Sequence, residues 1–510
     1  MKSRRMRRLR WGGAAVALGA ATVLVAPPGA SAEITGCVLE GERQIVGLPM
    51  PDDGRAPGAV DVRSLRSSIP SVLVLPPDRA GGDPDPQEFG AAVVAADFDD
   101  DGCVDLLVGA PGANRVYLVD GEQADERVAA VTVLAEDVLP EADGSERFGA
   151  ALAVERVYAS PGEPGSGLHR VWIGAPGAAV EGQQAAGAVV HHTIDAELGL
   201  SELTVISQNS PGVPGSAETG DRFGEVLEPI GDVALPSTDE QPPPTGFPSG
   251  VAVGVPREDV GSKVDAGMVA LVPAPGGKAL PTPRSLTQDS AGVSGSTEAG
   301  DRFGSALDFD ASPREPVPVL WVGTPREDLG RTVDAGSVHR FQVSPTTVRQ
   351  NLYLTQDSAG VPGATEAGDR FGSSVESVIS AGCSSAGRPV VAIGSPNEDV
   401  GGRSDAGMLS LYSGAANRCG PLTGGSAGDL TGSSVAQGPR GQQGVEDDYA
   451  DTLVWGSPGE DVGSVRDAGV VQAATSSEPE LVVSAFTASS GAGAGLRYGS
   501  VLGSYALNAP

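Results

Sequence analysis

The sequence predicts an all-β fold assembled from seven copies of one four-stranded antiparallel unit, and three observations lead to this prediction. The 510 residues include 73 glycines and 41 prolines, whereas only 20% are charged, a balance typical of many turns and short strands. A tripeptide, Gly-x-Pro, occurs seven times along the chain. An aromatic-Gly pair comes before nearly every copy, so the two signals together define an internal repeat.

The two signals mark the ends of neighbouring strands in each repeat, because both close or open short apolar runs. The Gly-x-Pro copies begin at Gly47, Gly109, Gly174, Gly254, Gly323, Gly394 and Gly456. The aromatic-Gly pairs begin at Phe89, Phe148, Phe223, Phe303 and Phe371, and Thr431-Gly432 takes the sixth place. In the fourth repeat the expected strands span 303–309, 319–323, 336–343 and 351–355.

The two ends of the repeat array complement each other. The first Gly-x-Pro, at Gly47, has no aromatic-Gly pair before it, and the pair Tyr498-Gly499 has no Gly-x-Pro after it. If a strand at 498–505 lies beside a strand at 44–47, every repeat is complete. We therefore expect a seven-bladed β-propeller of four-stranded antiparallel blades, closed by pairing the C-terminal strand with N-terminal strands. Several sandwich domains are the alternative, but they leave the two half-repeats unexplained.

The expected domains are a signal peptide and one propeller. Basic residues between Lys2 and Arg10 precede an apolar run and an Ala-Ser-Ala site that ends at Ala32, which is typical of a secretory signal. We assign 1–32 to the signal and 33–510 to the propeller. The expected blades are 76–136, 137–208, 209–288, 289–355, 356–424 and 425–488 for blades 1 to 6, and 33–75 with 489–510 for blade 7.

Charge and hydropathy restrict the partners. The net charge is −32, and removing the six basic residues of the signal gives 28 − 66 = −38. Such a chain repels nucleic acid and anionic membranes, whereas cations and basic partners are attracted. No later apolar run approaches the ~18 residues that span a bilayer. We expect a secreted monomer, with attachment to the cell surface through lipidation at Cys37 as an alternative.

One acidic stretch predicts a metal site. Asp97, Asp99 and Asp101 alternate between two expected strands, and Gly102 allows the chain to turn. Hard cations take oxygen ligands, so these carboxylates, the carbonyl oxygen of Cys103 and the carboxylate of Asp105 are expected to bind Ca²⁺. A solvated acidic hairpin turn is the alternative. An EF-hand does not fit, because the flanking segments have strand character and no glutamate stands at loop position twelve.

These residues carry a resemblance to a known family. Phe-Gly and Gly-Ala-Pro, with Asp-x-Asp-x-Asp-Gly-x-x-Asp between them, resemble the FG-GAP repeats of the integrin alpha-chain propeller, in a bacterial secreted form. The resemblance covers about 34–510 and implies a seven-bladed propeller with calcium in the loop between the first two strands of a blade. Only the first repeat keeps the full acidic loop, so ligation is expected at Asp97, Asp99, Asp101, Cys103 and Asp105 alone.

The implied topology also suggests how the four cysteines pair. Loops between the first and second strands share one face with loops between the third and fourth strands. Cys383 and Cys419 fall in two such loops of blade 5, and Cys37 and Cys103 fall in such loops of blades 7 and 1. We predict the disulfides Cys383–Cys419 and Cys37–Cys103, each contributing about 2–4 kcal/mol.

A second repeated element is expected on the opposite face. Four loops carry a Glu-Asp pair: Glu258 and Asp259, Glu327 and Asp328, Glu398 and Asp399, and Glu460 and Asp461. One interpretation is that arginines of neighbouring blades pair with these loops while Asp and Gly shape the turns. The other is an acidic rim that captures cations or a basic ligand.

The sequence favours a binding function over catalysis. With four histidines, of which His191 and His192 point to opposite faces of an expected strand, a triad or zinc site has few candidates. Gly424-Gly425-Ser426-Ala427-Gly428 matches a hydrolase pattern but lacks a strand-to-helix setting. We expect a secreted calcium-binding propeller that binds an extracellular protein or glycan in cell adhesion. The alternative is an extracellular hydrolase or lyase that uses carboxylates at the propeller mouth.

Overall fold

The computed structural model describes residues 43–49, 58–64, 72–74, 76, 88–101, 103–121, 131–135, 139, 143–157, 168–231, 249–277, 280–282, 284–311, 315, 317–378, 389–414, 420–437, 452–477, 480–487, 497–502 and 504–505. The chain divides into two units, Met1–Thr35 and Gly36–Pro510, and every described residue belongs to the second. The predicted signal peptide lies outside the described residues. None of the helices found among the described residues is long and apolar enough to cross a membrane.

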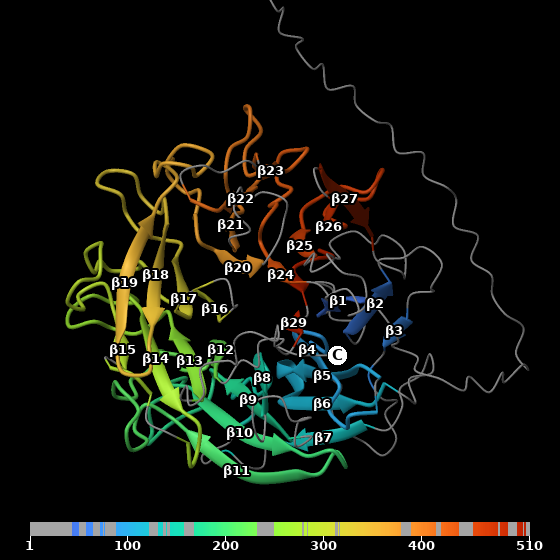
Figure 1. The fold of residues 1–510 in the computed structure, drawn as a ribbon, viewed down its shortest axis with the longest axis vertical. Helices are drawn as coiled ribbons and strands as arrows, with labels where there is room; N and C mark the ends of the chain where they lie inside the picture. Colours follow the sequence, from blue (N-terminus) through green and yellow to red (C-terminus); the bar gives the residue numbers. More distant parts are fainter. Residues whose placement is uncertain are drawn as a thin grey trace, which may run out of the picture. The chain divides into compact units, whose positions relative to one another are not determined.

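Seven antiparallel sheets form the unit Gly36–Pro510, and they confirm the predicted all-β, seven-bladed propeller (Figure 1). We number the blades as in the sequence analysis. Blade 1 contains β4 (Ala92–Ala96), β5 (Asp105–Ala110), β6 (Arg115–Val119) and β7 (Val131–Ala135), with the short helix η1 (Pro111–Ala113) after β5. Blade 2 contains β8 (Ala151–Val157), β9 (Leu168–Ala175), β10 (Ala188–Ile194) and β11 (Leu200–Ile206).

The next four sheets repeat this order along the chain. Blade 3 contains β12 (Val226–Ile230), β13 (Gly250–Val255), β14 (Met268–Pro273) and β15 (Ser285–Leu286). Blade 4 contains β16 (Ala306–Asp310), β17 (Val319–Thr324), β18 (Ser337–Val343) and β19 (Val348–Leu354). Blade 5 contains β20 (Ser374–Val378), β21 (Val390–Ser395), β22 (Met408–Tyr412) and β23 (Leu422–Thr423). Blade 6 contains β24 (Val435–Gln437), β25 (Leu453–Ser457), β26 (Val470–Ser477) and β27 (Glu480–Phe486).

Blade 7 contains strands from both ends of the described chain. Its order is β28 (Val501–Leu502), β1 (Arg43–Leu48), β2 (Ala59–Ser64) and β3 (Val72–Val74). β28 runs antiparallel to β1, with Val46 opposite Leu502 and Gly47 opposite Val501. The following strand, β29 (Ser504–Tyr505), leaves this sheet and pairs in parallel with β4 of blade 1. The segment 498–505 therefore holds two short strands that serve two blades, where the sequence suggested one strand.

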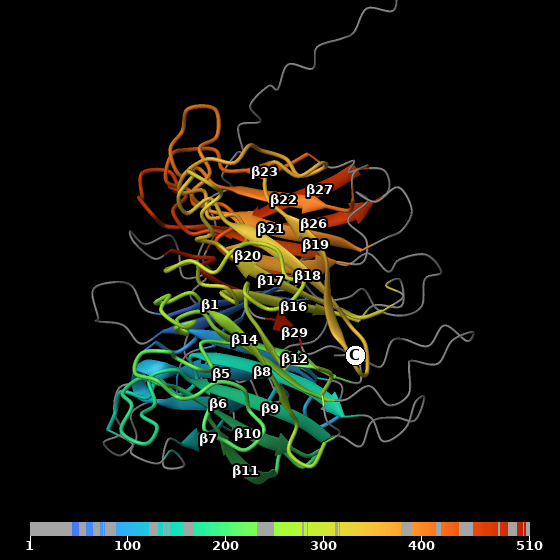
Figure 2. The ribbon, with the colours of Figure 1, turned by 90° about the vertical axis from the view of Figure 1, so that its left-hand side faces the viewer.

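The innermost strands of successive blades lie next to one another around the ring (Figures 1 and 2). β4 contacts β8, and the same relation continues through β12, β16, β20 and β24. β24 contacts β29, and β25 contacts β28, so blade 6 is followed by blade 7. Strands β1 and β28 in turn contact β4.

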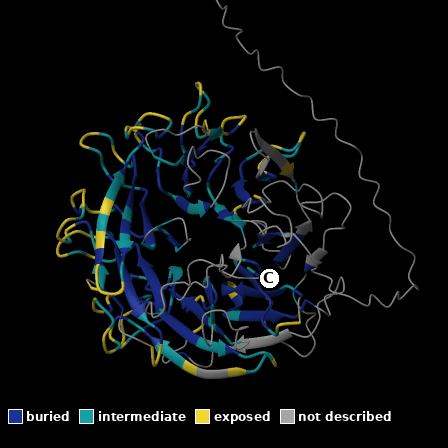
Figure 3. Ribbon diagram, in the orientation of Figure 1, coloured by how far each residue is buried: buried dark blue, intermediate teal, exposed yellow. Residues whose placement is uncertain are grey.

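The second strand of each blade is the most deeply buried, because neighbouring blades cover both of its faces. All six residues of β5, β13, β17 and β21 are buried, which explains why these strands read as continuous apolar runs. The fourth strand of blade 4, β19, instead mixes buried and exposed positions. Figure 3 shows buried strands within the ring and exposed residues in the outer loops. The hydrophobic core therefore lies between blades; one cluster joins Val94 and Leu107 of blade 1 to Val171 of blade 2.

The two repeated dipeptide signals meet at the blade junctions. A Cβ atom added to a glycine of Gly-x-Pro would lie 1.8–2.2 Å from the carbonyl oxygen of the Phe-Gly glycine in the following blade. The seven pairs are Gly47 and Gly90, Gly109 and Gly149, Gly174 and Gly224, Gly254 and Gly304, Gly323 and Gly372, Gly394 and Gly432, and Gly456 and Gly499. The second glycine of each pair has a φ of 84–91°, which L side chains rarely adopt. Glycine is thus required on both sides of every junction.

The aromatic residue of each Phe-Gly pair anchors the same junction. Phe89, Phe148, Phe223, Phe303, Phe371 and Tyr498 are fully buried. Tyr498 differs from the phenylalanines in that its hydroxyl donates a hydrogen bond of 3.0 Å to Oδ2 of Asp61, which is also fully buried. This bond connects the segment before β28 to β2.

Replacing Tyr498 by Phe tests this buried bond. Phenylalanine occupies the equivalent position in five other blades, so the ring itself fits, but the Asp61 carboxylate loses a donor. We expect Tyr498→Phe to lower the free energy of unfolding by about 1–3 kcal/mol, the cost of leaving a buried polar group without one partner. Urea unfolding measures the change. Tyr412→Phe, which removes a hydroxyl from a half-buried ring, is the control, and an equal loss in both variants would contradict the special role of Tyr498.

Candidate metal centre

The acidic loop between β4 and β5 brings carboxylates to the end of the first two strands of blade 1. Asp97 directly follows β4 and is buried, and Asp105 begins β5 and is fully buried. Between them, Asp99 is half-buried and Asp101 is exposed. The acids therefore become more exposed from Asp97 to Asp101, and the chain then returns to the core at Asp105.

The carboxylates converge into two overlapping clusters. Oxygen atoms of Asp97, Asp99 and Asp105 lie within 4.8 Å of one another, as do oxygen atoms of Asp99, Asp101 and Asp120. Asp120 was not predicted from the sequence. It directly follows β6, and its side chain is buried. The sequence did contain a signal for Asp120, because an Asp-Gly pair follows the third strand, and loops after the first and third strands share one face of a blade.

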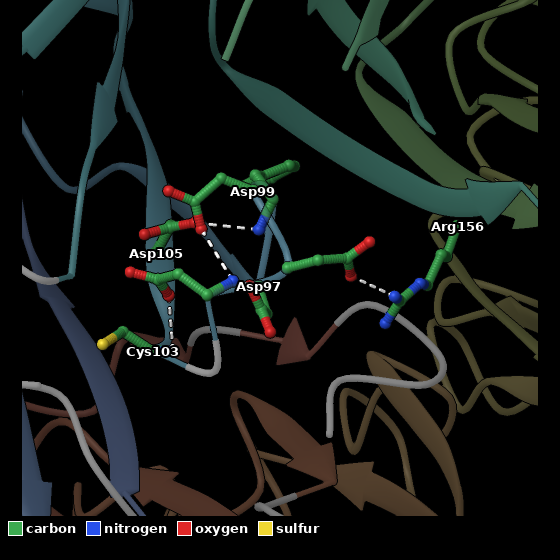
Figure 4. Close-up of polar contacts among 8 residues, drawn as sticks. Asp97, Asp99, Cys103, Asp105 and Arg156 are labelled. Atoms are coloured by element: carbon green, nitrogen blue, oxygen red, sulfur yellow. Dashed lines mark hydrogen bonds and ion pairs between the residues drawn. The ribbon is translucent and has the colours of Figure 1, made fainter. Parts of the chain in front are cut away.

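Backbone amides orient these carboxylates (Figure 4). The two oxygens of Asp105 accept hydrogen bonds of 2.8 Å from the amide of Phe98 and 2.7 Å from the amide of Gly121. Asp105 thereby ties the β4–β5 loop to the turn after β6. Oδ1 of Asp97 accepts a bond of 3.1 Å from the amide of Asp101, whose own Oδ1 accepts one of 2.6 Å from the amide of Cys103.

The carboxylates carry unfavourable charge when no cation is present. Burial raises the pKa of Asp105 to about 7, and the charges of Asp99 and Asp120 add to the rise, while the amides of Gly121 and Phe98 oppose it. Burial likewise raises the pKa of Asp99 to about 6, with further contributions from the charges of Asp101 and Asp97. A bound cation would remove this repulsion, so the five acids fit a metal site with oxygen ligands.

The exposed part of the acidic loop contacts blade 2. Asp100 has a φ of 60° and forms an ion pair with Arg156 at the end of β8. Figure 4 shows Arg156 to one side of Asp97, Asp99 and Asp105, with its side chain directed towards the loop. The loop is therefore held both by its own blade, through Asp105, and by its neighbour.

The cysteine predictions are only partly covered by the structure. Cys103 is buried next to the acidic loop, and no free cysteine is found among the described residues. Cys37, Cys383 and Cys419 lie outside the described residues, as does Gly102. The pairings Cys37–Cys103 and Cys383–Cys419 therefore remain predictions.

The eight acids of the expected rim separate into two sets. Three of the four glutamates accept hydrogen bonds from glutamine amides of the preceding blade connection: Gln208 to Glu258 at 2.6 Å, Gln288 to Glu327, and Gln356 to Glu398 at 2.5 Å. Glu460 belongs to the corresponding loop of blade 6. The aspartates accept the amide of the residue six positions later: Asp259 from Asp265, Asp328 from Asp334, Asp399 from Asp405, and Asp461 from Asp467.

The two sets have different surroundings. Glu327 and Glu398 are buried, whereas Asp259, Asp399 and Asp461 are exposed. The sequence suggested that arginines pair with these loops. Arg257, which belongs to one of these loops, forms an ion pair with Glu225 of its own blade at 3.7 Å, so the pairing with arginines of neighbouring blades stays a prediction. The aspartates close their own loops, and three of the glutamates are tied through glutamine to the connection that precedes their blade.

The buried carboxyl group of Glu327 is expected to make the stability of the protein depend on pH. Burial raises the pKa of its carboxyl to about 7, although the Gln288 amide lowers it. Between about pH 4.5 and 7 the folded chain holds a proton that the unfolded chain has released, so stability falls as pH rises through this window. At pH 8 we expect the free energy of unfolding of Glu327→Gln to exceed that of wild type by on the order of 1–3 kcal/mol.

Urea unfolding at pH 4 and pH 8 measures this effect, and the two proteins should match at pH 4, where the wild-type carboxyl is protonated in both states. Glutamine keeps an acceptor for the Gln288 amide. Glu366→Gln, a charge removal at an exposed position, is the control. A variant that loses stability at pH 8 would contradict the interpretation.

The fold and the loop together define a class of protein: a seven-bladed β-propeller with a multi-carboxylate loop between the first two strands of blade 1. Comparison with known families agrees with this class, since residues 89–128 match the family model described as the FG-GAP repeat. This range contains the whole acidic loop and Asp120. The chain thus contains an FG-GAP repeat at residues 89–128 and folds as a seven-bladed β-propeller, as the sequence predicted. No curated protein matches the chain.

Proposed function

We propose that the protein is a secreted β-propeller that binds Ca²⁺ at the blade 1 loop and binds an extracellular protein or glycan in cell adhesion. The observation that carries this proposal is the convergence of Asp97, Asp99, Asp101, Asp105 and Asp120 within an FG-GAP repeat. A rigid ring with loops on both faces is a common platform for recognition, because loops can vary while the blades hold them in place.

Calcium is the cation that best suits this donor set. Ca²⁺ takes six to eight oxygen ligands at about 2.3–2.6 Å in a flexible arrangement, and carboxylates with a backbone carbonyl supply such ligands. The carbonyl of Cys103 is the expected backbone donor, and the side chain of Asp120 adds a carboxylate from another loop. Magnesium demands stricter octahedral geometry and retains its water, so it suits this crowded set of protein oxygens less well. The ion would join the β4–β5 loop to the turn after β6.

A ligand screen tests the proposed function. The mature chain would be presented to immobilised matrix proteins, glycans and cell-wall polymers, with calcium and with a chelator. Saturable binding to one of these classes is expected from the wild-type protein. Failure to bind any of them in either condition would count against a binding function, and it would leave the metal site to be judged by its own measurement.

An alternative function has one specific observation in its favour. The innermost strands of blades 3 and 4 carry two carboxyl groups, Glu228, which is half-buried, and Asp308, which is buried. Burial raises the pKa of both, and raises that of Asp308 to about 7, with the nearby Asp310 adding to the rise. Oδ2 of Asp308 accepts a hydrogen bond of 2.5 Å from Ser377 of blade 5. Carboxyl groups with such pKa values can transfer protons, as a hydrolase or lyase requires.

Enzyme assays separate the two functions. A broad hydrolase screen of the purified chain would be repeated with Asp308→Asn and with the exposed Asp259→Asn as a control. Turnover that is retained in the control and lost in Asp308→Asn would replace the binding function by the catalytic one.

A further inference from the structure

A cavity of about 170 Å³ opens above blade 2, in an otherwise strongly acidic protein. Two arginines line it, Arg147 before β8 and Arg222 before β12. Pro176, Gly177 and Ala185 of the β9–β10 loop form its apolar walls. We call this cavity the blade 2 pocket.

The two arginines differ in how their charges are balanced. The guanidinium of Arg147 lies 2.8 Å from the carboxylate of Glu88, in an exposed ion pair. For Arg222, no carboxylate of the described residues lies within ion-pair distance. Exposed ion pairs contribute little and exchange readily with other anions. The pocket therefore holds positive charge that an incoming anion can use.

The corresponding loop of blade 3 shows what is unusual in blade 2. The loops 176–187 and 256–267 have equal length and share most of their backbone bonds. The amide of Arg222 donates to the carbonyl of Ala185 at 3.0 Å, as the amide of Arg302 donates to that of Asp265 at 3.2 Å. The left-handed φ angles also match, at 51° for Ala185 and 53° for Asp265. The two loops can therefore be compared residue by residue.

In blade 3, larger and charged residues take the places of the pocket walls. Arg257 stands where blade 2 has Gly177, and it pairs with Glu225. Asp265 stands where blade 2 has Ala185. Burial and the charges of Arg326 and Arg257 lower the pKa of Arg302, and the carboxylates of Asp265 and Glu225 oppose this change only in part. Blades 4, 5 and 6 keep the aspartate at this position, as Asp334, Asp405 and Asp467.

Blade 2 thus differs from its neighbours in two ways that act together. Gly177 removes a side chain, and a Cβ at this position would lie 1.9 Å from the carbonyl oxygen of Ser145, so the glycine also lets the adjacent connection come close. Ala185 offers no carboxylate at the position where blade 3 has that of Asp265. The first difference opens space, and the second leaves out an acidic side chain from the wall of the pocket beside Arg222.

We propose that the blade 2 pocket binds a single carboxylate presented by an acidic side chain of a peptide partner. A guanidinium matches the planar carboxylate with two parallel hydrogen bonds. The apolar walls of Pro176 and Ala185 suit the methylene groups that precede a glutamate carboxylate. Polyanionic chains are disfavoured, because the net charge of −32 repels them as a whole. The choice of a peptide as the partner rests on the proposed binding function. The binding of a carboxylate rests only on the residues of the pocket.

Nuclear magnetic resonance of the folded protein tests this proposal. With arginine labelled in the side chain, the Nε–Hε signals would be followed while acetyl-Gly-Glu-Gly-amide is added. We expect saturable shifts with a dissociation constant on the order of 1–10 mM, as befits one small contact. The glutamine peptide acetyl-Gly-Gln-Gly-amide should cause no saturable shift, because it lacks the charge.

Two variants and one control define the outcome. Arg222→Gln removes the guanidinium, and Ala185→Asp places in the pocket wall the carboxylate that blades 3 to 6 carry at the same backbone conformation. Each should weaken binding of the glutamate peptide at least about tenfold, the effect of losing a charge-assisted pair. Arg302→Gln, at the matching position of the next junction, should leave binding unchanged. The Ala185→Asp variant is expected to fold, because the corresponding loops of blades 3 to 6 already carry aspartate at this position.

Three results would overturn the proposal: equal shifts with the glutamate and glutamine peptides, unchanged binding by Ala185→Asp, or saturation by sodium sulfate or galacturonate with no response to the glutamate peptide. The titration needs no natural partner. A negative result therefore counts against the pocket alone, whereas a failed screen of macromolecular ligands counts against the proposed function.

Discussion

Replacing Gly323 by alanine is expected to cause the largest loss of stability, about 3 kcal/mol or more. The added Cβ would lie 2.1 Å from the carbonyl oxygen of Gly372 in the next blade. Overpacked cores usually lose 1–3 kcal/mol because side chains move aside. Here the obstacle is backbone, so the two blades must separate and lose contacts along β17 and β20.

Urea unfolding followed by circular dichroism measures this loss. Gly420→Ala is the matched control, since a Cβ at Gly420 meets no atom within 4 Å. The control should unfold at nearly the wild-type free energy. Similar stability of the two variants would show that the junction tolerates a side chain, and the structural explanation of the repeated glycine would be wrong.

Calcium is expected to produce the second large effect. An ion that binds only the folded chain stabilises it by mass action, by about 2.7 kcal/mol at a concentration 100 times its dissociation constant. Adding a chelator should remove this stabilisation, seen as a lower melting temperature. Asp101→Asn should melt at the same temperature with and without calcium, because it removes a charged ligand while its side-chain oxygen can still accept the Cys103 amide.

The neighbouring acid provides the control. Asp100→Asn makes the same change of charge one residue away, at a left-handed φ that asparagine tolerates, and it affects the ion pair with Arg156 instead of the cluster. This variant should keep its response to calcium. If calcium raised the melting temperature of Asp101→Asn as much as that of wild type, or raised neither, the metal site would be refuted. Asp105 is a poor choice for this test, since its carboxylate also holds two backbone amides.

The strand order could be predicted because one physical constraint recurs at every junction. Close approach of two backbones demands glycine on both sides, and that demand is visible in the sequence as Gly-x-Pro and Phe-Gly. In blade 4 the expected strands 319–323 and 336–343 correspond to β17 (Val319–Thr324) and β18 (Ser337–Val343). The first strand begins later than expected, at Ala306, because Phe303 and Gly304 belong to the turn before it.

The candidate site could be predicted only where its residues are neighbours in sequence. The β4–β5 loop shows its carboxylates as a local alternation, whereas Asp120 joins them through the fold, fifteen residues after Asp105. The blade 2 pocket was missed for a related reason. The pocket is recognised by comparing Ala185 with Asp265 in the corresponding loop of blade 3. This comparison requires the backbone hydrogen bonds of both loops, which show that the two residues occupy equivalent positions.

The split of the segment after Tyr498 into β28 and β29 has a consequence for how the protein forms. During synthesis, blades 1 to 6 can pair their own strands as soon as each has left the ribosome. The inner edges of β1 and β4 cannot gain their partners until Val501 to Tyr505 have emerged. Unpaired edges invite association with other chains until that moment. Nascent chains stalled before Val501 would therefore depend on chaperones, and release from them would coincide with completion of blade 7.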